Sequence, residues 1–528
     1  MTAEPAFRFV DLFAGIGGFH AVMKAFGGEC VYAVEIDKRA AAVYEANWGH
    51  AALGDITRDA DDDLGIMNVP AHDVLCAGFP CQPFSKSGAQ RGMDEARGTL
   101  FFNIASIIKA HHPRVVILEN VRNLIGPRHE HEWDVIIRTL REEGYNVSAL
   151  PAIFSPHLLP PHLGGTPQVR ERVFITATLA PAAVPKTADG SVDVRAIGPA
   201  PVATMSDRFP RTPDSHAPLF SPGAEDGGWN LVDGDLLDDS HTIPGCDLTP
   251  TERLWIDAWN AFTLMMRERT GDSLRGFPYW ADSWLDFPEA FEAMRRPPHL
   301  TRDLATGRYE PASTEGLHLP GSVTRPLIDR SLPAWKQSHL RRNYDAFESN
   351  WRDVLSWAWQ WGVYTDLFPA SRRKLEWQAQ DAKSLWDTVM HFRPSGIRAK
   401  RPTYLPALVA ITQTSIVGPR ERRLSPRETA RLQGLPDTFD FGSQPPAATY
   451  KQMGNGVAVG AVQHVFREHV LRDAHLLESL DKNGVDVGAR IVAAAKATTP
   501  EVVKQVLTAH QPMSPGARRP LLRTLRAH

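Results

Sequence analysis

The chain has 528 residues and a formal net charge of −3 at pH 7, and 43% of its residues are hydrophobic. This length predicts roughly two to four domains, and the composition is typical of a soluble globular protein. No run approaches the roughly 18 consecutive apolar residues of a membrane span, and the first residues lack the basic and apolar regions of a secretory signal. The charge does not exclude a nucleic-acid ligand, because a basic groove can lie on an acidic protein.

The cysteines are few and scattered, at positions 30, 76, 81 and 246. None forms a C-x-x-C pair, which argues against a zinc ribbon or a redox-active dithiol. Four cysteines in a chain of this length suit a reducing compartment. We therefore expect a cytoplasmic protein, and we predict no metal site.

Residues 7–180 alternate short apolar runs with helical patterns. Strands are predicted at Phe7–Phe13, Cys30–Glu35, Asp73–Gly78, Arg114–Val121 and Arg172–Thr178. Short β-rich runs alternating with helices indicate a parallel sheet covered on both faces. The predicted fold class is therefore α/β, with a doubly wound, Rossmann-like sheet.

The composition changes after about residue 180, where a Pro/Ala-rich stretch is typical of a linker or surface loop. Twelve of the fourteen tryptophans then lie between Trp229 and Trp386. They form either a second core or a surface that contacts a partner. The alternating pattern returns at about Arg401. The last stretch, Glu501–His528, holds five Lys or Arg against one Glu, which indicates a basic tail or a solvated helical extension.

A glycine-rich turn follows the first predicted strand, in "DLFAGIGGFH" (Asp11–His20). Glycines let a backbone approach a ligand closely, and a helix N-terminus follows. Glu35 ends the second strand, where an acid commonly binds ribose hydroxyls, and Asp55 is placed to accept from an adenine amino group. The spacing departs from G-x-G-x-x-G because His20 takes the sixth position. An adenosyl group without a pyrophosphate therefore fits better than NAD, and a purely structural turn remains the alternative.

A thiol lies in the loop "CAGFPCQPFSKSG" (Cys76–Gly88), after the third predicted strand. Loops at the carboxyl ends of parallel strands build active sites in such sheets. Glu119 ends the next strand, so it should emerge on the same rim as Cys81 and form a nucleophile and proton-donor pair. Arg170 and Arg172 occupy alternate positions of a further strand, so both can point into one cleft. An inert cysteine and a chance pair of surface arginines are the alternatives.

Taken in order, these residues resemble the cytosine-C5 DNA methyltransferase family. The matching motifs are "DLFAGIGGFH", "VEID", "GDI", "GFPCQPFSKSG", "RGTLFF", "ILENV", "QVRERVF", "RLSPRETARLQGLP" and "KQMGNGVAVG". They follow the order of the family and cover about residues 7–180 and 401–472. The resemblance does not cover most of residues 181–390.

The resemblance implies a domain organisation. Residues 1–180 and 401–475 would form the catalytic and cofactor-binding domain, and residues 181–400 an inserted target-recognition domain that binds DNA. Residues 476–528 would be a helical or basic extension. The inserted segment is long for this role.

The resemblance also implies the chemistry. The enzyme would transfer a methyl group from S-adenosylmethionine to C5 of a cytosine that is flipped out of double-stranded DNA. Cys81 would add to C6, Glu119 would hydrogen-bond the N3 edge, and Arg172 would hold the O2 region. Arg170 would brace the cleft or contact the recognition domain. The loop from Ser85 to Gly98 would close over the flipped base.

Further site residues follow from motif position. Those expected to bind the cofactor are Phe13, Gly15, Ile16, Gly18, Glu35, Ile36, Asp55, Ile56, Pro80, Leu100, Asn455 and Val457. Those expected to bind DNA are Ser85, Gln90, Arg393, Arg398, Lys400 and Arg401. The last four lie in "RPSGIRAKR", whose charge suits phosphate or guanine contacts, although a solvated face has the same pattern.

Three alternatives remain beside this hypothesis. One is the same chemistry on tRNA, which the long inserted segment disfavours. Another is a catalytically silent DNA-binding relative, against which Cys81, Glu119 and Arg172 argue. The third is a nucleotide-dependent oxidoreductase. The expected partners are double-stranded DNA and a cognate restriction endonuclease without a stable complex, and the expected state is a monomer.

Overall fold

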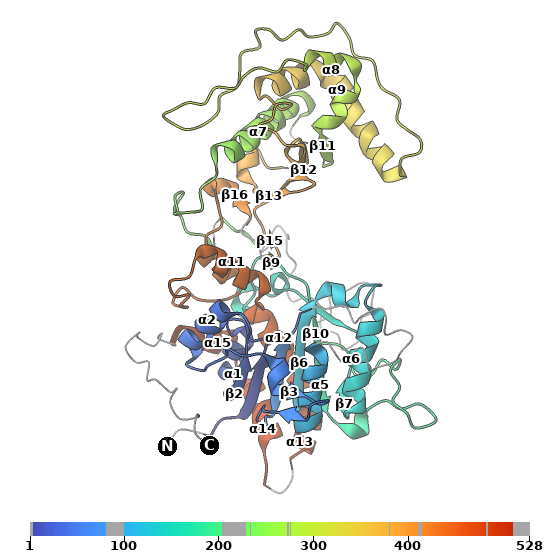
Figure 1. The fold of residues 1–528 in the computed structure, drawn as a ribbon, viewed down its shortest axis with the longest axis vertical. Coiled ribbons are helices and arrows are strands. Elements are labelled where there is room, and N and C mark those ends of the chain that lie inside the picture. The colour runs from blue at the N-terminus through green and yellow to red at the C-terminus, as the bar shows by residue number, and fades with distance from the viewer. Residues whose placement is uncertain are drawn as a thin grey trace. The chain divides into compact units, whose positions relative to one another are not determined.

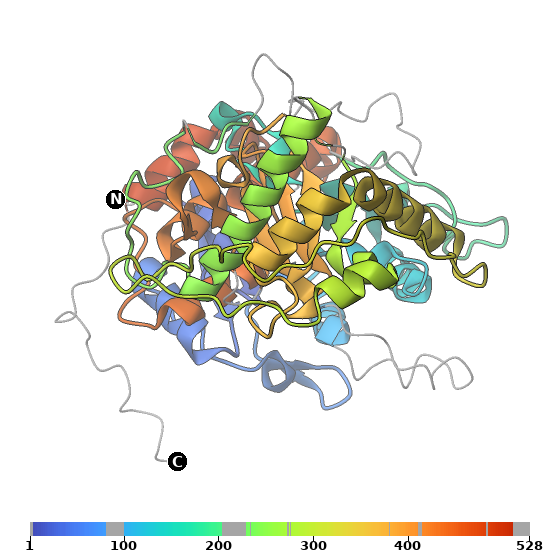
Figure 2. The same ribbon diagram turned by 90° about the horizontal axis from the view of Figure 1, so that it is seen from above.

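The computed structural model describes residues 4–80, 100–202, 229–232, 234–271, 274, 276–379, 381–409, 414–481 and 484–509. Cys81, Ser85 and Gln90 lie outside these described residues. The chain forms two compact units, which can be followed by residue colour in Figure 1 and from a second direction in Figure 2. The first unit spans residues 1–229, 406–412 and 429–528, and the second spans residues 230–405 and 413–428.

The first unit is built around a sheet with seven strands among the described residues, in the order β2-β1-β5-β6-β10-β7, with β8 beside β10. The strands are β1 (Phe7–Leu12), β2 (Gly28–Val34), β5 (Val74–Gly78), β6 (Val115–Val121), β7 (Tyr145–Val147), β8 (Ala152–Phe154) and β10 (Arg172–Leu179). Strands β2, β1, β5 and β6 are parallel, as predicted. Strand β10 is antiparallel to its neighbours, a direction that hydrophobic periodicity does not reveal.

Helices cover both faces of this sheet (Figure 1). Alternate residues of β1, β5 and β6 pack against α5 (Leu100–His111) and α6 (Glu130–Glu142) on one face. Helices α1 (Gly18–Ala25), α12 (Val459–Arg472), α13 (Ala474–Ser479) and α14 (Val487–Ala497) lie against β1 and β10 on the other. The fold is therefore the expected Rossmann-like α/β class. No helix in the described part of the chain is both long and apolar enough to cross a membrane.

The chain beyond α14 is packed against the first unit. Residues Pro500–Ala509 form α15, which contacts α1, and its Val503 and Leu507 are buried. These residues are helical, as expected, but the helix is solvated on one side only, because its apolar face contacts α1. Residues 510–528 lie outside the described residues.

Residues 181–202 and Trp229 also belong to the first unit. The buried guanidinium of Arg141 donates to the carbonyl oxygens of Val147, at 2.8 Å, and Ala196, at 2.9 Å. The indole of Trp229 donates to the carbonyl of His157 at 2.8 Å. These bonds tie the Pro/Ala-rich stretch to the sheet domain, so the compact units divide later than the expected boundary at residue 181.

The second unit has a separate sheet with the order β11-β12-β14-β13-β16-β17. These strands are β11 (Pro278–Trp280), β12 (Lys374–Gln378), β13 (Val389–Arg393), β14 (Gly396–Lys400), β16 (Ile416–Val417) and β17 (Arg422–Arg423). Its longest helices are α7 (Pro250–Thr270), which begins with a capping box of Thr249 and Glu252, and α9 (Ala334–Gln360). The short α8 (Pro288–Ala293) precedes a long irregular stretch that leads to α9.

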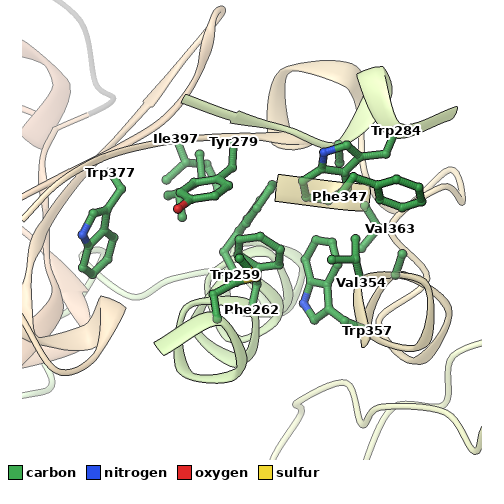
Figure 3. Packing of buried hydrophobic residues seen from close by; sticks show 14 of the residues in the cluster. Trp259, Phe262, Tyr279, Trp284, Phe347, Val354, Trp357, Val363, Trp377 and Ile397 are labelled. Carbon is green, nitrogen blue, oxygen red and sulfur yellow. The ribbon is translucent and has the colours of Figure 1, made fainter. Parts of the chain in front are cut away.

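Tryptophans form much of the core of the second unit (Figure 3). Trp259 packs against Trp357 with ring centroids 5.1 Å apart, and Phe262 stacks on Trp284 at 5.5 Å. Trp377 of β12 is fully buried on the same side of the sheet. Large aromatic rings bury much apolar area in such cores. Most of the tryptophan-rich segment is therefore a second core, the first of the two alternatives.

Candidate active site

The glycine-rich turn connects β1 to α1 with three residues in the left-handed region. Phe13 and Gly15 have φ of 56°, and Gly17 has φ of 93°. A bulky residue such as Phe13 rarely adopts a positive φ, so the surrounding contacts must hold the loop in this shape. Glycine meets the same requirement at Gly15 and Gly17 without a steric cost.

At two positions of this turn, a neighbouring side chain comes so close to the backbone that only glycine fits. A Cβ on Gly17 would overlap the indole of Trp48. A Cβ on Gly18 would lie 2.5 Å from Cγ2 of Val457. The turn therefore packs against α2 (Lys38–Trp48) on one side and against the late "GNG" motif on the other. The first glycine loop and the late "GNG" motif therefore lie side by side, which agrees with the expectation that residues of both bind the cofactor.

Glu35 holds the turn from the end of β2. Its Oε2 accepts from the backbone N–H of Gly15 at 2.9 Å, and its Oε1 accepts from the N–H of Asp37 at 2.7 Å. A carboxylate has about four lone-pair positions. Each oxygen of Glu35 therefore keeps capacity to accept from a ligand hydroxyl.

A cavity of about 390 Å³ opens beside this turn. This volume lies within the roughly 300–1,000 Å³ of small-molecule sites. It is lined by Phe13–Ile16, Gly18, Phe19, Glu35–Asp37, Ala40, Gly78–Pro80, Glu119–Val121, Arg172, Gln433, Leu435 and residues 451–457. All of these residues belong to the first unit.

Nine of the twelve residues expected to bind a cofactor line this cavity: Phe13, Gly15, Ile16, Gly18, Glu35, Ile36, Pro80, Asn455 and Val457. Ile36 is 72% exposed, unusual for an apolar side chain. The other three expected residues are not among the lining residues. Asp55 caps α3 (Ile56–Asp59) by accepting from Thr57, Ile56 is buried, and Leu100 begins α5.

The rim of the cavity is formed by the carboxyl ends of β5 and β6. Gly78 lies opposite Glu119 in their parallel register. The side chain of Asn120 donates to the carbonyl of Phe79 at 3.1 Å, which fixes the start of the loop after β5. Pro80, the last described residue before Cys81, lines the cavity. The sequence therefore predicted the shared rim, although Cys81 itself lies outside the described residues.

Glu119 and Arg172 form an ion pair in the wall of the cavity. The distance from Arg172 Nε to Glu119 Oε1 is 2.9 Å, and both side chains are largely buried. Burial raises the pKa of the Glu119 carboxyl above its usual range, against the opposing effects of Arg172 and Arg170. A carboxyl group with a raised pKa is suited to hold or donate a proton.

Arg170 is also buried but contacts different atoms. Its guanidinium donates to the carbonyl oxygens of Gly454 at 2.8 Å, Gly456 at 2.5 Å and Leu408 at 3.1 Å. Burial lowers the pKa of Arg170 to about 9. The prediction that both arginines point into one cleft is therefore wrong. The chain is irregular between β9 (Gln168–Val169) and β10, so residues 170 and 172 do not share one strand face. Arg170 braces the loop that lines the cavity.

Several residues that position this site are not among the site residues predicted from the sequence. Trp48 Nε1 donates to the carbonyl of Ile16 at 2.9 Å. Asn47 exchanges two hydrogen bonds with the backbone of Asp440, at 2.7 and 2.9 Å. Lys451 forms a 2.8 Å ion pair with Asp37 at the cavity. Their partners are distant in sequence, and only the unusual pair of Asn and Trp at the end of a helix gives any local signal.

The basic segment expected to bind DNA lies in the second unit on β13 and β14. Arg398 pairs with Glu376 at 2.8 Å, and Arg393 reaches the same carboxylate at 3.5 Å. Arg401 pairs with Asp381 at 2.6 Å, and Lys400 lies 5.6 Å from the ring of Tyr404. Arg393, Arg398 and Lys400 alternate with the core residues Phe392, Ile397 and Ala399, so they occupy the polar face of the sheet.

Within the described residues, no group of three or more His, Cys, Asp or Glu is arranged to hold a metal ion. The site therefore consists of a glycine turn, a ligand-sized cavity and a buried carboxyl–guanidinium pair. Together with the sheet order, these features define a Rossmann-like methyltransferase.

Comparison with known proteins identifies the family. The family described as C-5 cytosine-specific DNA methylase matches residues 7–471. The type II methyltransferase M.AluI of Cellulosimicrobium cellulans is 61% identical over 526 residues, covering 96% of this chain and 99% of that protein. The type II methyltransferase M.HhaI of Haemophilus parahaemolyticus is 44% identical over 168 residues, covering 32% of this chain and 48% of that protein.

The chain belongs to the C-5 cytosine-specific DNA methylase family. It is a DNA (cytosine-5-)-methyltransferase whose substrate is DNA, and its relatives are type II methyltransferases. The nucleotide-dependent oxidoreductase and the catalytically silent relative are thereby set aside.

Proposed function

We propose that the enzyme transfers the methyl group of S-adenosylmethionine to one cytosine of a specific duplex sequence, as the modification enzyme of a restriction-modification system. One observation carries this proposal. The cavity beside the glycine turn also contains the Glu119–Arg172 pair and Pro80, so a cofactor and a cytosine ring would meet in one space.

The cavity residues fit an adenosyl cofactor. Phe13 and the exposed Ile36 offer apolar surface for a flat ring, and Glu35 has free acceptor capacity for hydroxyl groups. We propose that Gly15, Ile16, Gly18, Pro80, Asn455 and Val457 complete the site. When bound, S-adenosylmethionine supplies an electrophilic methyl group on a sulfonium sulfur. Asp55, Ile56 and Leu100 are left out of the proposed site because they do not line the cavity.

Glu119 is proposed to bind the N3 edge of the flipped cytosine. Its raised pKa favours a carboxyl that keeps a proton, which can be donated to N3 as the ring accepts electrons. Arg172 orients this carboxyl through their 2.9 Å contact and would hold the O2 region of the base. Arg170 is proposed as a positioning residue, because its three contacts are to the loop backbone.

Cys81 is proposed as the nucleophile, by its position directly after Pro80. Its thiolate would form a bond to C6, and the electron pair of the C5–C6 double bond would then attack the methyl group from C5. A base takes the proton from C5, the C5–C6 double bond re-forms, and the thiolate leaves. The enzyme is regenerated, and the products are a 5-methylcytosine and the demethylated cofactor.

DNA binding is proposed for the second unit. Arg393, Arg398, Lys400 and Arg401 carry the charge that phosphates require, and the first three lie on one face of a sheet whose other face is core. Ser85 and Gln90, which lie outside the described residues, are proposed to contact the DNA beside the flipped base. We further propose a cytoplasmic monomer that forms no stable complex with a cognate endonuclease.

Methyl transfer from radiolabelled S-adenosylmethionine tests this function. We expect incorporation into duplex DNA but not into tRNA, and bisulfite sequencing should show protected cytosines in one short sequence context. Cys81→Ser and Glu119→Gln should abolish incorporation, whereas Cys30→Ser, at a half-buried cysteine that does not line the cavity, should retain it. Incorporation into tRNA alone, or activity that survives Cys81→Ser, would overturn the proposal.

A further inference from the structure

Helix α9 of the second unit has two halves of different character, which are seen in yellow and gold in Figure 1. The helix bends at Asn350, where φ is −137° and ψ is 21°. The half after the bend supplies core residues such as Trp357 and Val354 (Figure 3). The half before the bend buries Leu340, Tyr344 and Phe347 and leaves its other side to solvent.

The solvent side of this first half carries an aromatic and cationic stripe. Trp335, His339 and Arg342 follow one another at spacings of four and three residues, which places them on one helix face. Trp335 is 66% exposed, and its ring meets that of His339 edge-on at 5.9 Å. A tryptophan this exposed is unusual in a unit whose other tryptophans mostly form the core.

The stripe continues onto the sheet. The side chain of Asn343 accepts from the N–H of Trp280 at 2.7 Å and donates to the carbonyl of Pro278 at 2.9 Å, which joins α9 to the edge strand β11. Lys374 lies opposite Trp280 on β12, with its ammonium 5.6 Å from the indole ring. Lys374 shares the polar face of β12 with Glu376, the partner of Arg393 and Arg398.

The charges of this surface are not neutralised. Among the residues that the structure describes, Lys336, Arg342 and Lys374 form no ion pair with a carboxylate. Acidic residues appear on α9 only from Asp345 onward, and Asp345 already pairs with Arg325 at 2.7 Å. Burial lowers the pKa of His339, and the nearby Lys374 and Arg342 lower it further. Arg342 and Lys374 therefore both lie near His339, and neither forms an ion pair with a described carboxylate.

We propose that this surface, the α9 cationic surface, is a second DNA contact continuous with the basic face of β13 and β14. It is defined by Trp280, Trp335, Lys336, His339, Arg342 and Lys374. Charge complementarity selects the ligand, because unpaired Lys and Arg side chains beside the exposed indole of Trp335 suit a phosphate backbone and its sugars. The inference rests on the proposed DNA binding by the second unit and extends it beyond residues 393–401.

The two kinds of side chain have separable roles. Lys336, Arg342 and Lys374 neutralise phosphates, and each phosphate contact contributes about 0.9 to the slope of log K against log salt. The indole of Trp335 packs against the DNA without neutralising charge. It therefore contributes to affinity but not to the salt slope.

Fluorescence anisotropy of a labelled random-sequence duplex tests the surface, with the full-length protein between about 50 and 200 mM salt. Lys336→Ala combined with Arg342→Ala should reduce the salt slope by about 2 and raise Kd by at least roughly tenfold. Trp335→Ala should raise Kd at an unchanged slope, and Trp335→Phe should restore much of the affinity. Arg296→Ala is the matched control, an exposed cation of the same unit that follows α8.

Each outcome decides between the proposals. If the double variant kept the wild-type salt slope and Kd, or if Arg296→Ala changed both by the same amount, the proposal that the α9 cationic surface binds DNA would be overturned. The proposed function would be left intact. A wild-type protein without salt-dependent binding and without methyl transfer to duplex DNA would overturn the proposed function itself. Unchanged near-ultraviolet circular dichroism of the variants excludes misfolding, and these side chains lie on the surface of the unit.

Discussion

The indole nitrogen of Trp48 donates a 2.9 Å hydrogen bond to the carbonyl of Ile16, at the centre of the glycine turn. Trp48 is the last residue of α2, and its ring stacks on His20 of α1 with centroids 4.5 Å apart. It does not line the cavity, yet it supports the backbone that does. The shape of the proposed cofactor site therefore depends on a residue behind it.

Trp48→Phe should weaken cofactor binding and leave the fold intact. The variant keeps an aromatic ring but removes the indole N–H that donates the hydrogen bond. One such hydrogen bond contributes about 0.5–1.5 kcal/mol. We expect Kd for S-adenosylhomocysteine, measured by calorimetry, to rise roughly 2- to 10-fold. Trp133→Phe is the control, because it removes a 2.9 Å bond of the same type to Ala149, which does not line the cavity. Equal affinities for the two variants would contradict this role.

The two glycines at positions 15 and 17 should respond differently to alanine. Both have a positive φ, which costs about 1–2 kcal/mol for a residue with a Cβ. A Cβ on Gly15 meets open space, whereas a Cβ on Gly17 overlaps Trp48. Gly15→Ala should therefore lower the free energy of unfolding by about 1–2 kcal/mol, and Gly17→Ala by a further 1–3 kcal/mol, roughly, through overpacking. Urea titration of both variants measures the difference, and equal losses would show that the overlap is relieved.

Much of this site could be predicted because its residues lie at the ends of strands or in the turn after a strand, and a local sequence pattern indicates such positions. A glycine turn after a strand, an acid at the end of the next strand and a carboxyl at the end of β6 all lie at strand ends. Parallel strands bring their carboxyl ends to one edge. Gly15, Glu35 and Glu119 all line one cavity, which agrees with their expected places at the ends of parallel strands.

The remainder depends on contacts that no local pattern encodes. The carbonyl partners of Arg170 are 238 and 286 residues away along the chain. The direction of β10 and the attachment of residues 181–202 to the first unit also depend on tertiary packing, through β6 and Arg141. Asp55 was expected to accept from an adenine amino group, but capping of α3 engages its carboxylate.

Arg170 and Arg172 should separate stability from catalysis. In Arg170→Lys, one compact ammonium nitrogen replaces a planar guanidinium whose two separate nitrogens reach the carbonyl of Leu408 and those of Gly454 and Gly456. Each buried group left unpaired costs about 1–3 kcal/mol. The melting temperature should therefore fall by several degrees. Arg172→Lys disturbs a less buried ion pair at the proposed binding site of the flipped cytosine. We therefore expect kcat to fall roughly 100-fold with little change in melting temperature. If instead Arg170→Lys kept its melting temperature and lost activity, while Arg172→Lys lost stability and kept its activity, the two roles would be reversed.

Stability should fall as the pH falls from 7 to 5, and His469 should account for part of the loss. Its Nδ1 lies 3.0 Å from Arg472 and its Nε2 lies 3.0 Å from Thr178, which donates to Asp473 at 2.8 Å. Arg472 can only donate, so Nδ1 must accept and the ring must be neutral. Burial lowers the pKa of His469 to about 4, against the opposing effect of Asp473 and with a further lowering by Arg472.

The sign follows from proton uptake. Between pH 6.5 and 4 the unfolded chain binds a proton at His469 and the folded protein does not, so unfolding is favoured as the pH falls. A shift from the usual 6.5 to about 4 costs about 2 kcal/mol between pH 7 and pH 5. His469→Gln, which cannot titrate, should lose correspondingly less stability over this range in urea titrations followed by circular dichroism. His131→Gln, at an exposed histidine, should behave as the wild type. The same pH dependence in His469→Gln and wild type would show that this histidine does not stay neutral in the folded protein.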